Sequence, residues 1–177
     1  YNTSRKDGII ALGLNDDDEL IGVKLTEGHD EIIMSTHHGM VIRISEEEVR
    51  SMGRVSKGVK GISLSHNDHV VAVENIADGQ ELLTITENGY GKRTDLREFR
   101  LQGRGGKGLI GIRCTNKNGK VAGVTAISPG DEIMIITKDG IIIRTFADDI
   151  SSFGRATQGV KVMHLGENDQ VQAIAKV

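Results

Sequence analysis

The chain has 177 residues, with 22 basic and 25 acidic side chains and a net charge of −3, which is ordinary for one soluble domain with a hydrophobic core. Its only cysteine, Cys114, excludes an internal disulfide, and no apolar run approaches the roughly 20 residues that span a bilayer. Trp is absent and aromatic residues are scarce, so we expect a core of Ile, Val, Leu and Met.

The chain opens with a segment that matches only the second half of the units that follow it. Gly8–Leu25 aligns with Gly58–Ile76, so we expect residues 1–28 to form half of a blade. The missing first half and the absence of an initial Met indicate a piece of a longer protein. The acidic run Asn15–Glu19 aligns with a turn and lacks the spaced ligands of a calcium loop, so we interpret it as a solvated turn.

Three full repeats of about 50 residues follow, at 29–78, 79–129 and 130–177. Each begins with two β-rich runs joined by a turn that ends in Gly39, Gly89 or Gly140. Asn-Gly and Asp-Gly sequences at such turns favour the positive φ angles of tight hairpins. A basic residue follows each of these glycines by four positions, and these residues are Arg43, Arg93 and Arg144.

The second half of each repeat contains further turn and strand signals. A polar stretch able to form one helical turn comes first, near Glu46–Val49, Asp95–Phe99 and Asp148–Ile150. A glycine-rich turn follows, beginning at Gly53, Gly103 and Gly154, then a strand-like run, a polar turn and a closing strand. Four short strands per repeat predict an all-β, propeller-like or pinwheel array of blades. A β-solenoid fits less well because its repeats are usually shorter, and the lack of Trp disfavours the WD40 type.

Positive charge is concentrated in one segment. Residues 89–120 contain nine Lys and Arg residues against Asp95 and Glu98, a local sum of about +7, which leaves about −10 for the rest of the chain. This asymmetry is typical of a one-sided anion-binding surface.

The box-like sequence Gln102–Gly108, QGRGGKG, resembles the Gln-basic-Arg-Gly-Gly-basic-Gly box of the C-terminal DNA-wrapping domain of DNA gyrase A. The repeats around it, including Gly89–Thr94, are similar to blades of that family along essentially the whole chain. Gly103 departs from the family pattern, which has a basic residue there. The family's principal box lies in its first blade, whereas this box lies in the next-to-last repeat, so the resemblance suggests a secondary box here, with the principal one expected upstream of Tyr1.

The resemblance implies a six-bladed β-pinwheel that wraps double-stranded DNA on its outer rim and supports ATP-dependent negative supercoiling by the whole enzyme. It implies no catalytic residue, metal or cofactor in this chain, because ATP and Mg are bound elsewhere in the enzyme. The implied partners are the N-terminal part of gyrase A and the gyrase B protein in an A2B2 complex, in the bacterial cytoplasm on the chromosome and not in a membrane. The alternatives are the related C-terminal domain of the A-type polypeptide of topoisomerase IV and a protein-interaction propeller.

The expected DNA contacts centre on the box. Arg104 is expected to bind phosphate oxygens in bidentate fashion, and the glycines are expected to let backbone N–H groups approach a phosphate. The candidates in and around the box are Gln102, Arg104, Gly105, Gly106, Lys107, Gly108, Lys92, Arg93, Arg97, Arg100, Arg113 and Lys120. Candidates at other repeat positions, which equally could brace a turn or pair with carboxylates, are Arg43, Arg54, Lys57, Arg144, Arg155 and Lys161. Few aromatic residues accompany them, which argues against single-strand binding by stacking.

Several other patterns carry no expected function. The glycines from Gly103 to Gly108 match a dinucleotide fingerprint on paper, but a β-type run follows instead of a helix. The histidine pairs His37–His38 and His66/His69 are expected to be surface imidazoles without zinc geometry. Cys114 is expected to be a core residue because no catalytic base accompanies it.

Overall fold

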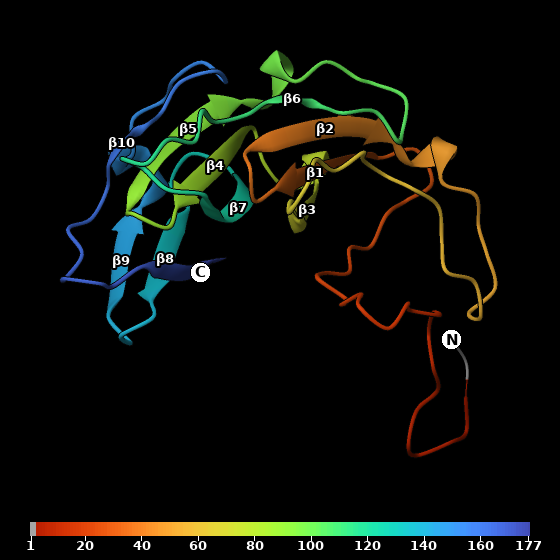
Figure 1. Cartoon of the computed structure of the whole chain (residues 1–177). Helices are drawn as coiled ribbons and strands as arrows, with labels where there is room; N and C mark the ends of the chain where they lie inside the picture. Colours follow the sequence, from red (N-terminus) through yellow and green to blue (C-terminus); the bar gives the residue numbers. More distant parts are fainter. Residues whose placement is uncertain (1–2) are drawn as a thin grey trace.

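The protein is an all-β array, and the computed structural model describes residues 3–177 (Figure 1). It contains three antiparallel sheets and four short 3-10 helices. Within the described residues, no helix is long and apolar enough to cross a membrane. The predicted fold class is therefore confirmed, with blades built mainly from Ile, Val and Leu.

The first sheet has the strand order β3-β1-β2-β6. Its strands are β1 (Glu31–Thr36), β2 (Met40–Ser45), β3 (Val70–Asn75) and β6 (Leu109–Ile110). β1 and β2 form the predicted hairpin, with Gly39 at φ +87° in its turn. This conformation is strained for side chains other than glycine, which explains the glycine at the repeat position.

The second sheet repeats this arrangement with the order β10-β5-β4-β7. Its strands are β4 (Glu81–Thr86), β5 (Tyr90–Asp95), β7 (Val121–Ile127) and β10 (Val160–Lys161). The third sheet, within the described residues, has the order β11-β8-β9. Its strands are β8 (Glu132–Thr137), β9 (Ile142–Phe146) and β11 (Val171–Lys176).

Each four-stranded sheet takes its outermost strand from the following repeat. β6 belongs to residues 79–129 but pairs with β2 of the repeat before it, and β10 pairs in the same way with β5. β9 has no such strand among the described residues, and its side chains are accordingly exposed, with Ile142 60 % and Phe146 50 % accessible. Neighbouring repeats are therefore joined by backbone hydrogen bonds as well as by side-chain packing.

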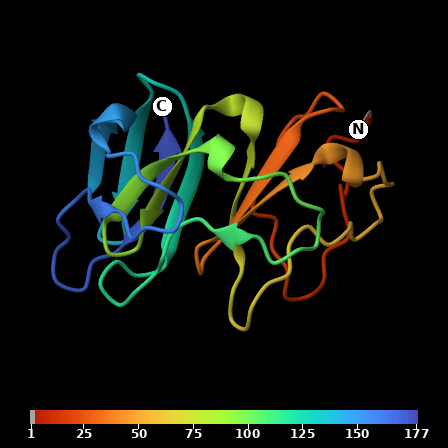
Figure 2. The same cartoon turned by 90° about the horizontal axis from the view of Figure 1, so that it is seen from above.

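The core lies between neighbouring sheets. One buried cluster joins the first and second sheets and includes Ile33, Leu82 and Phe99. Another joins the second and third sheets and includes Leu83 and Ile135. Adjacent residues of β4 serve different clusters because successive side chains of a strand point to opposite faces. Figure 2, seen from above, shows the first sheet beside the other two.

The predicted helical turns are confirmed as η1 (Glu46–Glu48), η3 (Leu96–Glu98) and η4 (Ala147–Asp149). A further one, η2 (Ile76–Asp78), was not predicted and follows the closing strand β3. The Ser45 and Asp95 side chains cap η1 and η3 by accepting hydrogen bonds from backbone N–H groups.

Two of the strand-like segments differ from expectation. Residues 3–30 and 59–64 contain no strand. In the second and third repeats, the run after the glycine-rich turn pairs with the sheet of the preceding repeat. No sheet precedes residues 59–64 among the described residues, so this run lacks the partner strand with which it would form a strand. The N-terminal segment still makes one repeated contact, because Gly13 N donates to Ser56 O as Ser63 N does to Gly106 O.

Candidate nucleic-acid interface

The segment from Arg100 to Ile110 carries the box from one sheet to the next. In Figure 1 it arches over the outer edges of β5 and β2, away from the closing strands β3 and β7. The buried side chain of Phe99 anchors its start, and Gln102 N donates a hydrogen bond to Arg43 O at 2.8 Å. The segment ends in β6, so the box is held at both ends by the neighbouring repeat.

The glycines of the box have mainly a packing role. A Cβ placed on Gly108 would lie 2.6 Å from Val41 O, because the residues leading into β6 come close to the backbone of its partner strand β2. Gly105 N donates to Gly61 O at 2.5 Å, and Gly106 O accepts from Ser63 N at 2.8 Å. The expectation that the Gly105 amide binds a phosphate is therefore wrong, because this donor already has a partner in the preceding repeat.

Arg104 is an exposed side chain fixed to the preceding repeat. Its backbone N donates to the Glu48 carboxylate at 2.8 Å, and its Nε donates to Glu48 O at 3.1 Å. Its Nη1 donates to Lys60 O at 3.3 Å. These bonds use two of the three guanidinium nitrogens and orient the planar group, while the side chain stays open to solvent.

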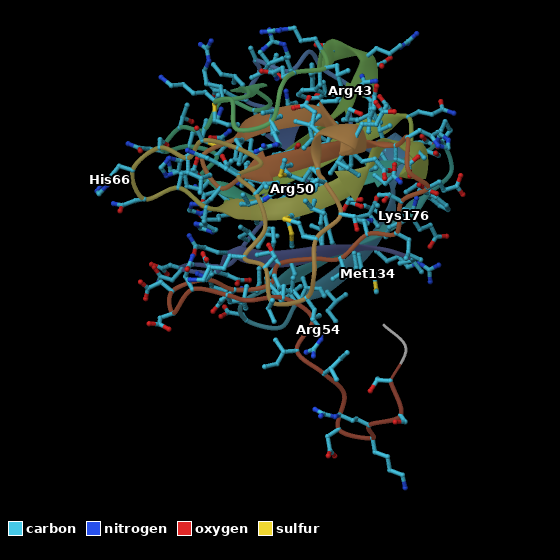
Figure 3. All side chains as sticks on the ribbon, turned by 90° about the vertical axis from the view of Figure 1, so that its right-hand side faces the viewer. Arg43, Arg50, Arg54, His66, Met134 and Lys176 are labelled. Carbon is cyan, nitrogen blue, oxygen red and sulfur yellow. The ribbon has the colours of Figure 1, made fainter. Side chains whose placement is uncertain are left out.

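Two of these three contacts recur one repeat later at Arg155. Its N donates to the Glu98 carboxylate at 3.0 Å, and its Nη1 donates to Ile110 O at 3.4 Å. Glu98 and Ile110 lie 50 positions after Glu48 and Lys60, so the two turns are attached to the preceding repeat at equivalent positions. Arg54 occupies the corresponding position in the first repeat and is exposed; Figure 3 shows it beside the N-terminal segment, well below Arg43.

The arginines that follow the hairpin glycines brace neighbouring repeats. Arg43 pairs with Glu31 and donates through Nη1 to Leu96 O at 3.2 Å and Phe99 O at 3.1 Å. Arg93 does the same in the second sheet, pairing with Glu81 and donating to the carbonyl of Ile150.

Their side chains are only 21 % and 18 % exposed. Arg144 pairs with Glu132 and is 60 % exposed. For Arg43 the structural alternative holds, and Arg93, expected as a direct contact, bonds through Nε and Nη1 to protein acceptors in the same way.

Lys92 is completely buried, although it was expected on the DNA surface. Its ammonium donates to Gly154 O at 2.7 Å, Arg155 O at 2.6 Å and Thr157 Oγ1 at 3.1 Å. Burial lowers its pKa from 10.5 to about 8, against the attraction of Glu98. The prediction of a direct contact is wrong for Lys92, because its three protons have partners inside the protein.

The remaining candidate cations differ in their exposure and in their protein partners. The exposed ones are Arg54, Lys57, Arg97, Arg100, Arg104, Lys107, Arg113 and Lys161, whereas Lys120 is half-buried. Arg97 is held by Asp95, whose pKa this guanidinium lowers to about 2 through side-chain hydrogen bonds. Lys57 donates to the side-chain carbonyl of Asn15 at 2.5 Å.

One cluster adds Lys117 and Tyr90 to the predicted candidate Lys161. Lys117 and Lys161 both lie over the Tyr90 ring, with their Nζ atoms 5.6 Å and 4.9 Å from its centroid. Lys161 reaches this position because β10 pairs it with Tyr90 across two repeats. Nothing in the local sequence reveals this pairing, because the two residues are 71 positions apart.

The remaining signals contribute no site. Cys114 is half-buried and packs against the first core cluster, and its pKa is raised by that burial, as expected for a core residue. His37 is not fully on the surface: its ring stacks on His69 with centroids 4.6 Å apart, and its Nε2 lies 3.2 Å from Glu87. His66 projects at a loop tip (Figure 3). Among residues 3–177 no group of His, Cys, Asp and Glu is arranged to hold a metal.

Comparison with known proteins matches one family to all four segments of the chain. The family described as "DNA gyrase C-terminal domain, beta-propeller" matches residues 1–27, 30–77, 80–128 and 131–177. The DNA gyrase A protein of Halalkalibacterium halodurans is 60% identical over 173 residues, covering 98% of this chain and 21% of that protein. That of Clostridium acetobutylicum is 48% identical over 177 residues, covering 100% and 21%. The chain thus spans about a fifth of the length of these relatives.

Two solved structures are closely similar. A DNA gyrase A C-terminal domain superposes with a TM-score of 0.88 at 30% identity, covering 97% of this chain and 58% of that chain. The C-terminal domain of a DNA topoisomerase IV gives a TM-score of 0.88 at 29% identity, covering 94% and 52%.

Proposed function

This chain belongs to the family of DNA gyrase C-terminal domains with a β-propeller fold, and we propose that it binds duplex DNA, without reading base sequence, along the outer side where its glycine-rich turns lie. The observation that carries the proposal is the recurrence of a braced arginine turn on successive repeats, at the exposed Arg104 and the half-buried Arg155.

The chemistry of these turns suits a phosphate backbone. An arginine whose guanidinium is already oriented loses little freedom when it binds a phosphate oxygen. Lys107 adds an exposed positive charge three residues after Arg104. Regularly spaced cations on a curved array favour a bent duplex, and contacts to phosphates position DNA without specifying sequence.

The proposal extends to the whole protein. Because the relatives are DNA gyrase A proteins of which this chain covers about a fifth, we assign it the wrapping role in ATP-dependent negative supercoiling. In this proposal the blades belong to a six-bladed array, and the cleavage and ATP sites lie in other parts of an A2B2 complex with the gyrase B protein. The complex acts in the bacterial cytoplasm, on the chromosome.

Binding to a duplex of about 40 base pairs, followed by fluorescence anisotropy over a salt series, tests the first step. Counterion release predicts that log K falls by roughly 0.9 per phosphate contact for each unit of log salt. The double variant Arg104→Ala/Lys107→Ala should bind more weakly and reduce that slope by about 2. Competitor duplexes of unrelated sequence should bind equally well.

The matched control is Lys138→Ala/Lys176→Ala, which removes the same charge from exposed positions outside the glycine-rich turns. It should leave the slope close to that of the unaltered chain. Equal losses in the two double variants would mean that net charge alone drives binding. Absence of DNA binding at low salt would reject the proposal for this chain.

A further inference from the structure

Lys92 lies beneath the glycine-rich turn of the third repeat. The three oxygens that accept its protons all come from Gly154–Thr157, more than 60 positions along the chain. Thr157 Oγ1 also donates to Gly154 O at 2.8 Å, which closes the turn around the ammonium. The charged groups that face Lys92 from neighbouring elements are Glu98 on η3 and Arg155 in the turn.

The turn above Lys92 differs in shape from the box one repeat earlier. In Gly103–Gly106 the third residue, Gly105, has φ +78°, the value of a type II turn. Its counterpart Ala156 has a negative φ, since only Asn67 and Asn168 are positive among the described non-glycine residues. Type I and type II turns differ by a flip of the central peptide. In the third repeat that peptide carries Arg155 O, which points to Lys92.

The residue beneath each turn matches the turn's sequence. Ile42 occupies the position of Lys92 in the first sheet, and its Cδ1 lies 3.5 Å from the site of a Cβ on Gly106. An apolar residue offers no donor, and the Gly-Gly turn above it is held by the preceding repeat: Gly105 N donates to Gly61 O, and Ser63 donates to Gly105 O and Gly106 O. The lysine therefore accompanies a turn without glycine at its centre.

We propose that Lys92 is a positioning residue for DNA binding, whose buried ammonium holds the Gly154–Thr157 turn in the shape that presents Arg155 to a phosphate. This inference rests on the proposed DNA-binding function. Lys92 does not touch DNA; it acts by capturing the two carbonyls on either side of the Arg155 Cα. Without the ammonium, Arg155 O loses the donor that Lys92 supplies, and Gly154 O keeps the bond from Thr157 Oγ1, so the turn must rearrange and Arg155 must move.

A double-variant cycle on the 177-residue chain tests the proposal through DNA affinity. Arg155→Ala should weaken binding about threefold at moderate salt and reduce the salt slope by about 0.9, the loss of one phosphate contact. Lys92→Met should cause a similar loss in the unaltered chain and none in the Arg155→Ala background. Additive losses, or no loss in Lys92→Met when Arg155→Ala is impaired, would overturn the proposal.

A compensating variant separates positioning from simple destabilisation. Lys92→Ile together with Ala156→Gly and Thr157→Gly recreates the Ile42 and Gly-Gly pairing of the first and second repeats. It should recover the affinity and salt slope that Lys92→Ile alone loses, and failure to recover them in a folded chain would also contradict the proposal. If Arg155→Ala has no effect while Arg104→Ala/Lys107→Ala does, the positioning role is rejected but DNA binding by the chain stands.

Discussion

Substitution of Gly108 tests how tightly the backbones of neighbouring repeats pack against each other. Gly108 and its repeat equivalent Gly58 have similar backbone conformations, with φ of +76° and +84°. Replacing either by Ala places a side chain in the left-handed region, at a cost of about 1–2 kcal/mol. Only at Gly108 would the new Cβ also meet backbone, 2.6 Å from Val41 O; at Gly58 the described residues leave open space.

The segment leading into β6 must move away from β2 to accommodate Gly108→Ala, and such overpacking typically costs a further 1–3 kcal/mol or so. We therefore expect a total loss of about 2–5 kcal/mol for Gly108→Ala and about 1–2 kcal/mol for Gly58→Ala. Urea unfolding followed by circular dichroism measures both. For a chain of this size the melting temperatures of the two variants should differ by roughly 3–10 °C. Equal destabilisation would refute the reasoning, because backbone conformation alone would then account for both glycines.

Three further outcomes follow from the side-chain contacts. Arg43→Ala should lower the free energy of unfolding by about 2–3 kcal/mol because it removes the donor of Phe99 O and leaves Leu96 O with the bond from Phe99 N, whereas the more exposed Arg144→Ala should cost under about 1 kcal/mol in the same denaturation assay. Burial lowers the pKa of Lys92 from 10.5 to about 8, so between these pH values the folded chain binds fewer protons at this site than the unfolded chain. The free energy of unfolding, relative to Lys92→Met, should therefore rise by up to about 3 kcal/mol between pH 8 and 10.5. A pH-independent difference between the two chains would contradict this. Asp95→Asn should release Arg97 and tighten DNA binding roughly two- to fivefold at low salt, measured by anisotropy, and unchanged affinity would show that Arg97 contacts no phosphate.

Much of the fold was readable from local sequence. The hairpin glycines Gly39, Gly89 and Gly140 all have positive φ, as Asx-Gly and related turns predict. The helical turns after the second strand of each repeat also form where expected. These features depend on the conformational preferences of residues a few positions apart, and repetition made them easier to recognise.

The box was located from sequence, but the purpose of its residues was not. Gly108 is required because the residues leading into β6 lie against the backbone of β2 in the preceding repeat. Lys92 and Arg93 carry charge in the sequence, yet the structure buries the first and pairs the second with Glu81 and the carbonyl of Ile150 in the next repeat. A count of charges therefore overestimated the surface available to DNA.

The sequence by itself determined the all-β class, the repeat and the segment in which positive charge gathers. Only the tertiary structure decided which repeat completes each sheet, which cations remain at the surface and which residue lies beneath each turn. The physical reason is separation along the chain. Turn and strand preferences act between near neighbours, whereas the pairing of β10 with β5 and the burial of Lys92 depend on contacts between residues some 60 to 70 positions apart.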